Sequence, residues 1–107
     1  MRFRPEHALL PVLAAVSVAA AGAPGAQRAV ELEELLRHDC GSCHGLTLEG
    51  GLGRPLVPEA MAARPPAALL ATILDGRPGT AMPPWRSLLS VEDARWLVER
   101  LQKGARP

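Results

Sequence analysis

The strongest constraint on this chain is a pair of cysteines three positions apart with a histidine directly after the second, in Cys40-Gly-Ser-Cys43-His44. This spacing is the attachment signal for a c-type haem. Each thiol can add to one vinyl group of the same porphyrin, and the histidine is then held where an imidazole nitrogen can ligate iron. A thioredoxin-like redox pair would need a βαβ pattern around the cysteines, and a structural zinc site would need four spaced ligands. No βαβ pattern is visible and His38 is the only other histidine nearby, so the motif indicates haem.

The N-terminus has the parts of an export signal. Arg2 and Arg4 supply positive charge, and residues 8–27 carry no charge and include a run of small residues after the apolar part. We therefore predict a signal peptide over residues 1–26, cut after Gly25 or Ala26, and a periplasmic location for the remainder. The alternative is an uncleaved membrane anchor, because the uncharged run is long enough to cross a bilayer. Its proline and its alanine content argue against an anchor.

The remaining residues, 27–107, form one small domain that is poor in aromatic side chains. It has no Phe and no Tyr, and its aromatic side chains are Trp85 and Trp96. A domain of this size has difficulty burying enough apolar surface by itself, and a covalently attached haem would supply the missing apolar body. The formal net charge of +1 is typical neither of a nucleic-acid binder nor of a polybasic membrane binder.

The hydrophobic pattern predicts an all-α domain of about three main helices around one haem. The first is expected from residue 30 to about residue 39, with apolar residues at i, i+3 and i+4 and acidic residues in its first turns. The second opens at Pro65 or Pro66 and ends at Gly76. The third begins at Ser90, which forms a capping box with Asp93, and has one apolar face. Residues 45–58 and 77–86 are expected to be loops because of their Gly and Pro content.

Iron in such a site usually has a second axial ligand, and the candidates are Met82, Met61 and His38. Met82 lies in a Gly- and Pro-rich loop, where two prolines directly after it restrict the backbone. A thioether is a soft ligand that favours ferrous iron. Met61 lies in an alanine-rich connector, which indicates packing, and His38 is expected to be a solvated surface histidine. We therefore predict His44 and Met82 as the axial pair.

These residues together resemble a class I cytochrome c over essentially the whole of residues 27–107. The shared features are the first helix, Cys-x-x-Cys-His-Gly, a Gly-x-Pro-Leu segment, a middle helix ending Ile-x-x-Gly, a Met-Pro-Pro-Trp loop and the last helix. The resemblance implies that Cys40 and Cys43 bond the haem, that His44 and Met82 ligate iron, and that the carbonyl of Pro55 accepts a hydrogen bond from the proximal imidazole. Two departures occur at the contact between the first and last helices. The first helix offers leucines only, and Arg100 replaces an aromatic residue on the last helix, with Trp96 one turn earlier.

The segments around the motif and around Met82 are similar to one subgroup, the small periplasmic monohaem cytochrome associated with the haem cd-type nitrite reductase of denitrifying bacteria. This similarity implies a monomeric one-electron carrier, not an enzyme, that donates electrons to nitrite reductase. An accessory role in maturation of its d-type haem stays open, and a small haem enzyme such as a peroxidase would require Met82 to leave the iron. Arg77 and Arg86 flank the Met82 loop, either as a docking patch for an acidic partner or as ordinary solvated side chains.

Overall fold

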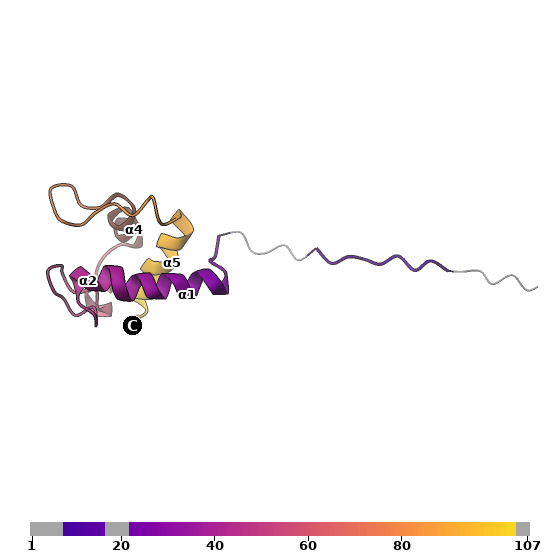
Figure 1. Ribbon diagram of the computed structural model, residues 1–107, viewed down its shortest axis with the longest axis horizontal. Coiled ribbons are helices and arrows are strands. Elements are labelled where there is room, and N and C mark those ends of the chain that lie inside the picture. The colour runs from indigo at the N-terminus through magenta and orange to yellow at the C-terminus, as the bar shows by residue number, and fades with distance from the viewer. Residues whose placement is uncertain (1–7, 17–21, 105–107) are drawn as a thin grey trace, which may run out of the picture.

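The computed structural model describes residues 8–16 and 22–104, and its folded part consists of helices joined by loops (Figure 1). The elements in chain order are α1 (Ala26–Leu35), the π-helical turn η1 (Leu36–Cys40), α2 (Gly41–His44), α3 (Pro58–Ala62), α4 (Pro66–Asp75) and α5 (Val91–Gln102). No strand occurs in the described ranges, so the predicted all-α class is confirmed. Residues 8–16 form no helix and extend away from the helical part.

The first helical segment is longer than the sequence pattern predicts. It begins at Ala26, four residues early, because Gly25 has an extended backbone and its carbonyl accepts a hydrogen bond from the Ala29 N–H at 2.9 Å. The helical backbone then continues through η1 and α2 to the end of the cysteine motif, where Gly45 has a φ of 93°. The expected end near residue 39 is therefore wrong, and the motif itself is part of the helix.

The two later helices confirm their predicted boundaries. Helix α4 begins at Pro66, because the first helical position tolerates a proline. Gly76, whose φ is 69°, follows its last residue. Helix α5 has the predicted capping box, in which Ser90 Oγ accepts from the Asp93 N–H at 3.0 Å and an Asp93 carboxylate oxygen accepts from the Ser90 N–H at 3.1 Å. Helix α3 was not predicted; a proline at its start and alanines within it allow one short turn of helix.

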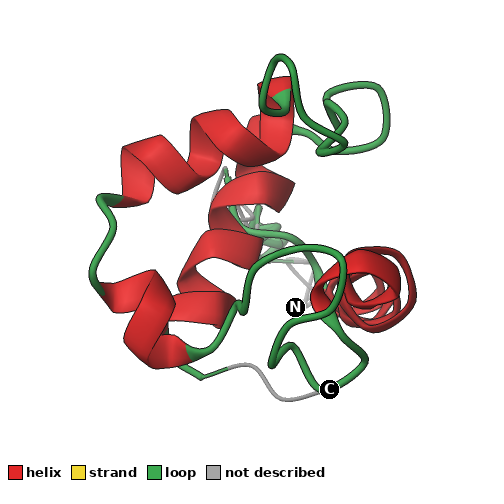
Figure 2. Ribbon diagram, turned by 90° about the vertical axis from the view of Figure 1, so that its left-hand side faces the viewer, coloured by secondary structure: helices red, strands yellow, loops and turns green. Residues whose placement is uncertain are grey.

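The core is made mainly of leucines, with one methionine, one alanine and one valine. Helix α5 packs against α4 and α3, and Figure 2 shows these helices with α1 around a common centre. The buried side chains are Leu32, Leu36, Leu48, Met61, Leu69, Leu74, Leu89, Ala94, Leu97, Val98 and Leu101. Met61 is 5% exposed, which confirms its predicted packing role.

Ion pairs join helices α1 and α5. Arg28 donates two hydrogen bonds to the Asp93 carboxylate, at 2.8 and 3.2 Å, and Arg100 pairs with Glu33. The Arg28 hydrogen bonds hold the pKa of Asp93 below its usual range. Arg100, which was expected to replace an aromatic residue of the family pattern, therefore takes part in this contact through Glu33.

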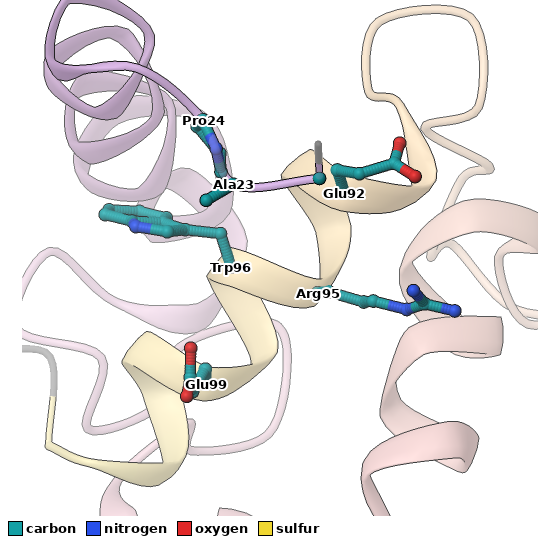
Figure 3. A pocket seen from close by; sticks show the side chains of 7 residues that line it. Ala23, Pro24, Glu92, Arg95, Trp96 and Glu99 are labelled. Carbon is teal, nitrogen blue, oxygen red and sulfur yellow. The ribbon is translucent and has the colours of Figure 1, made fainter. Parts of the chain in front are cut away.

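The residues just before α1 lie along α5. Ala23 and Pro24 face the half-buried Trp96 side chain, and together with neighbouring charged residues they line a small hollow of about 290 Å³ (Figure 3). Ala23 and Pro24 fall within the predicted signal peptide, and the position of its cut site stays a prediction. Among the described residues, no helix is both long enough and apolar enough to span a bilayer.

Candidate haem centre

The helix through the motif places the two cysteines differently. Cys40 is the last residue of η1 and is half-buried against the core, whereas Cys43 lies on α2 and is exposed. Burial and, to a smaller extent, the negative charge of Asp39 together raise the pKa of the Cys40 thiol to about 11. Without haem, Cys40 is therefore a protonated thiol at neutral pH, held at the inner side of the motif.

The His44 ring is fixed by a hydrogen bond from Nδ1 to the main-chain carbonyl of Arg54, with a distance of 2.7 Å between the two atoms. A carbonyl can only accept, so Nδ1 donates its hydrogen in this bond, and Nε2 is the ring nitrogen left for a metal. The predicted acceptor, the Pro55 carbonyl, is therefore wrong by one residue. The hydrogen bonds from Gly50 N to His44 O and from Gly53 N to Cys43 O hold the loop against the motif and bring the Arg54 carbonyl to the ring.

Met82 lies in a loop that is anchored to the end of α4. The Met82 carbonyl accepts a hydrogen bond from the Arg77 N–H at 3.2 Å, and the Met82 N–H donates to Thr80 Oγ1 at 3.3 Å. Gly76 allows this return of the chain, because a Cβ there would lie only 2.7 Å from the Met82 carbonyl oxygen. The backbone around the thioether is thus defined by local hydrogen bonds and by one close contact.

A second set of contacts closes the Met82 loop. The Trp85 N–H donates to the Ile73 carbonyl at 3.0 Å, and the Arg86 N–H donates to the Leu74 carbonyl at 3.2 Å. The Arg86 side chain pairs with Asp75, the last residue of α4, at 2.8 Å. Arg86 therefore braces the loop through an ion pair with the last residue of α4.

The structure brings the predicted site residues to one end of the domain. In Figure 1 the loop over residues 77–86 lies above α2 and the loop that follows it, at the same end of the domain. His38 lies away from this arrangement. Its side chain is 64% exposed and pairs with Glu34 at 3.0 Å one turn earlier on the same helix, which confirms a surface histidine.

The residues at this end fit a covalently bound haem. They supply two thiols, one imidazole nitrogen free to bind iron, and one thioether, and these donor types are the ones that hold haem iron in c-type cytochromes. Half-buried apolar side chains from three elements, Leu56, Ile73 and Trp85, adjoin the core beside them. The zinc alternative gains no support, because no three His, Cys, Asp or Glu side chains in the described part are grouped to hold a metal ion.

The all-α fold and this donor set define a class I c-type cytochrome. The family model described as "Cytochrome C oxidase, cbb3-type, subunit III" matches residues 27–99. Cytochrome c55X of Pseudomonas aeruginosa is 58% identical over 81 residues, which cover 76% of this chain and 68% of that protein. Cytochrome c55X of Paracoccus denitrificans is 56% identical over 96 residues, covering 90% of this chain and 92% of that protein.

Two solved structures extend these matches. The c-type cytochrome NirC has a TM-score of 0.77 and 56% identity, and the match covers 78% of this chain and all of that one. The dihydro-heme d1 dehydrogenase NirN, solved in complex with DHE, has a TM-score of 0.63 and 37% identity, covering 68% of this chain but only 16% of NirN. The chain therefore belongs to the cytochrome c55X family of c-type cytochromes. It is an electron carrier with covalently bound haem c and is not an enzyme.

Sequence reasoning missed two residues of the site, Arg54 and Gly53. Arg54 contributes only its main-chain carbonyl, so its side chain gives no signal. Gly53 did give a signal in the sequence. It lies in the glycine-rich loop after His44, and a glycine in such a loop indicates a close approach of the backbone to another group.

Proposed function

We propose that this chain is a periplasmic one-electron carrier whose haem is attached through Cys40 and Cys43 and ligated by His44 and Met82. The observation that carries the proposal is the 2.7 Å hydrogen bond between His44 Nδ1 and the Arg54 carbonyl. It leaves Nε2 as the metal-binding nitrogen on the residue directly after the second cysteine. The anchored Met82 loop at the same end of the domain supports the second ligand.

The side chains define what such a centre can do. When bound, the haem supplies an iron that changes reversibly by one electron. The Arg54 carbonyl fixes the orientation of the His44 ring and makes the imidazole more basic. The Met82 thioether favours the ferrous state and so raises the reduction potential. Two protein ligands leave no open position for a substrate, so electron transfer to and from partner proteins is the activity that this arrangement supports.

Nitrite reductase is the proposed electron acceptor, from the family to which the chain belongs. Stopped-flow mixing of the reduced protein with purified haem cd-type nitrite reductase tests this directly. We expect oxidation of the cytochrome to be much faster than with a non-cognate acceptor and to slow with rising salt if charge steers docking. Oxidation at equal rates by cognate and non-cognate acceptors would contradict donation to this enzyme.

A second candidate, assistance in maturation of the d-type haem, is favoured by one observation. A segment of dihydro-heme d1 dehydrogenase from Pseudomonas aeruginosa is 38% identical to 67% of this chain, although the match covers only 15% of that enzyme. A homologous cytochrome domain thus occurs within an enzyme whose name refers to haem d1. Deletion of the gene separates the two roles: nitrite reductase lacking d-type haem supports maturation, and intact but slowly reduced enzyme supports donation.

Export and oligomeric state belong to the same proposal. We expect the mature protein to be a periplasmic monomer without stable membrane association, beginning at Ala26 or Gln27 after the signal peptide is cut. The intact mass of the exported protein gives the first residue directly. A mature chain that begins at Gly22 or earlier would contradict the cut site and would retain the segment that packs on Trp96.

A further inference from the structure

The backbone of Gly53 lies against the imidazole ring of His44. A Cβ atom at residue 53 would lie 2.8 Å from Nδ1, 2.9 Å from Cε1 and 3.3 Å from Cγ of that ring. Real Cβ atoms essentially never come within 3.0 Å of another heavy atom in this way. No residue with a side chain therefore fits at position 53 while the ring keeps its place.

The backbone conformation does not explain why residue 53 is a glycine. Gly45 and Gly50 in the same loop have φ angles of 93° and 109°, which favour glycine by themselves. Gly53 is not among the residues with positive φ, so alanine would be free of backbone strain there. The imidazole ring is thus the feature that excludes a side chain.

Neither the ring nor the glycine can move aside without breaking a short hydrogen bond. The Gly53 N–H donates to the Cys43 carbonyl at 2.7 Å, which ties the glycine to the residue before His44. The ring is held by the 2.7 Å contact between Nδ1 and the Arg54 carbonyl. The glycine contact and the carbonyl contact come from consecutive residues and act on the same edge of the imidazole.

We propose that Gly53 is a positioning residue for the proximal imidazole, and that its missing side chain sets the rotation of the His44 ring. This inference rests on the proposed role of His44 as an iron ligand. A methyl group at residue 53 would push Nδ1 away from the Arg54 carbonyl and weaken that hydrogen bond. Because the bond makes the imidazole a more basic ligand, its loss favours ferrous iron and raises the reduction potential.

The test compares Gly53→Ala with Leu52→Ala in the full exported holoprotein. Leu52 is a matched control because it directly precedes Gly53 in the same loop and its side chain is 96% exposed. At a fixed ambient potential, we expect Gly53→Ala to raise the ratio of reduced to oxidised protein about fivefold, the effect of losing roughly one hydrogen bond. Leu52→Ala should stay within about twofold of the parent, so this readout separates ring positioning from a general perturbation of the loop. Equal ratios for the two variants would overturn the role of Gly53.

If Gly53→Ala does not fold, a measurement on the unmodified ferrous holoprotein tests whether Gly53 lies against the His44 ring. Nuclear Overhauser contacts between the Gly53 Hα protons and the His44 ring protons are expected, with a slowly exchanging Nδ1 proton. Absence of those contacts, with histidine still ligating the iron, overturns the inference about Gly53 alone. A holoprotein without a histidine ligand would instead overturn the proposed function.

Discussion

Asp93 links the start of α5 to α1, and replacing it with alanine tests the ionic contact between these helices. The residue is only 8% exposed. One of its carboxylate oxygens accepts hydrogen bonds from Ser90 N at 3.1 Å and from Arg28 Nε and Nη2 at 3.2 and 2.8 Å. Asp93→Ala therefore removes half of the capping box and the contact to α1 in one step.

The expected loss is about 2 kcal/mol of unfolding free energy. Loss of a helix cap costs about 1 kcal/mol. The hydrogen bonds to α1 bring the total to about 2 kcal/mol after a discount for solvent, because the Arg28 side chain is 36% exposed. For a domain of this size the corresponding fall in Tm is roughly 10 °C.

Acid should remove the same contribution. Because the pKa of Asp93 is lowered in the folded protein, its stabilisation is complete above the unfolded-state pKa of about 3.9. It is then lost as the pH falls through the lower folded-state pKa. The difference in stability between the parent and Asp93→Ala should thus be constant near neutral pH and shrink below about pH 4.

Denaturant unfolding of the holoproteins, followed by far-ultraviolet circular dichroism, measures this difference. Glu92→Ala is the matched control because it removes the same charge from the same turn of α5 at an exposed position. We expect it to change stability by no more than about 0.5 kcal/mol. If the two variants lose equal free energy of unfolding, the Arg28–Asp93 hydrogen bonds between α1 and α5 do not stabilise the fold as their geometry indicates.

Two further substitutions separate the ligand loop from the core. Gly76→Ala should displace Met82 and abolish the sulfur–iron absorption band of the ferric protein, because its Cβ would lie 2.7 Å from the Met82 carbonyl oxygen. Gly79→Ala has a similar φ of 77° but open space around it and should retain the band; loss of the band in both variants would contradict the contact argument. Met61→Ala should cost about 3 kcal/mol of stability with the reduction potential unchanged, and a large shift in potential would place Met61 at the haem rather than in the core.

Features that depend on near neighbours in the chain could be predicted from the sequence. The capping box of Ser90 and Asp93 and the end of α4 at Gly76 are set within a few residues, so the pattern locates them. The cysteine motif is also local, since its chemistry requires two thiols and an imidazole at fixed spacing. The packing of Met61 followed from its surroundings in the sequence.

Features that depend on contacts across the chain could not be predicted. The pairing of Arg28 with Asp93 joins residues 65 positions apart, and no local pattern specifies it. The carbonyl that meets His44 is set by how the loop folds back, so a family pattern placed it one residue late, at Pro55 instead of Arg54. The pairing of Arg86 with Asp75 likewise depends on how the Met82 loop returns to α4.

The proposed redox centre is one haem iron held between His44 and Met82, and near-infrared magnetic circular dichroism of the ferric holoprotein tests this most directly. The energy of the ligand-to-metal band distinguishes the pairs of axial ligands. We predict the band of a histidine–methionine pair in the unmodified protein. A band typical of two histidines, or of histidine and water, would contradict the account.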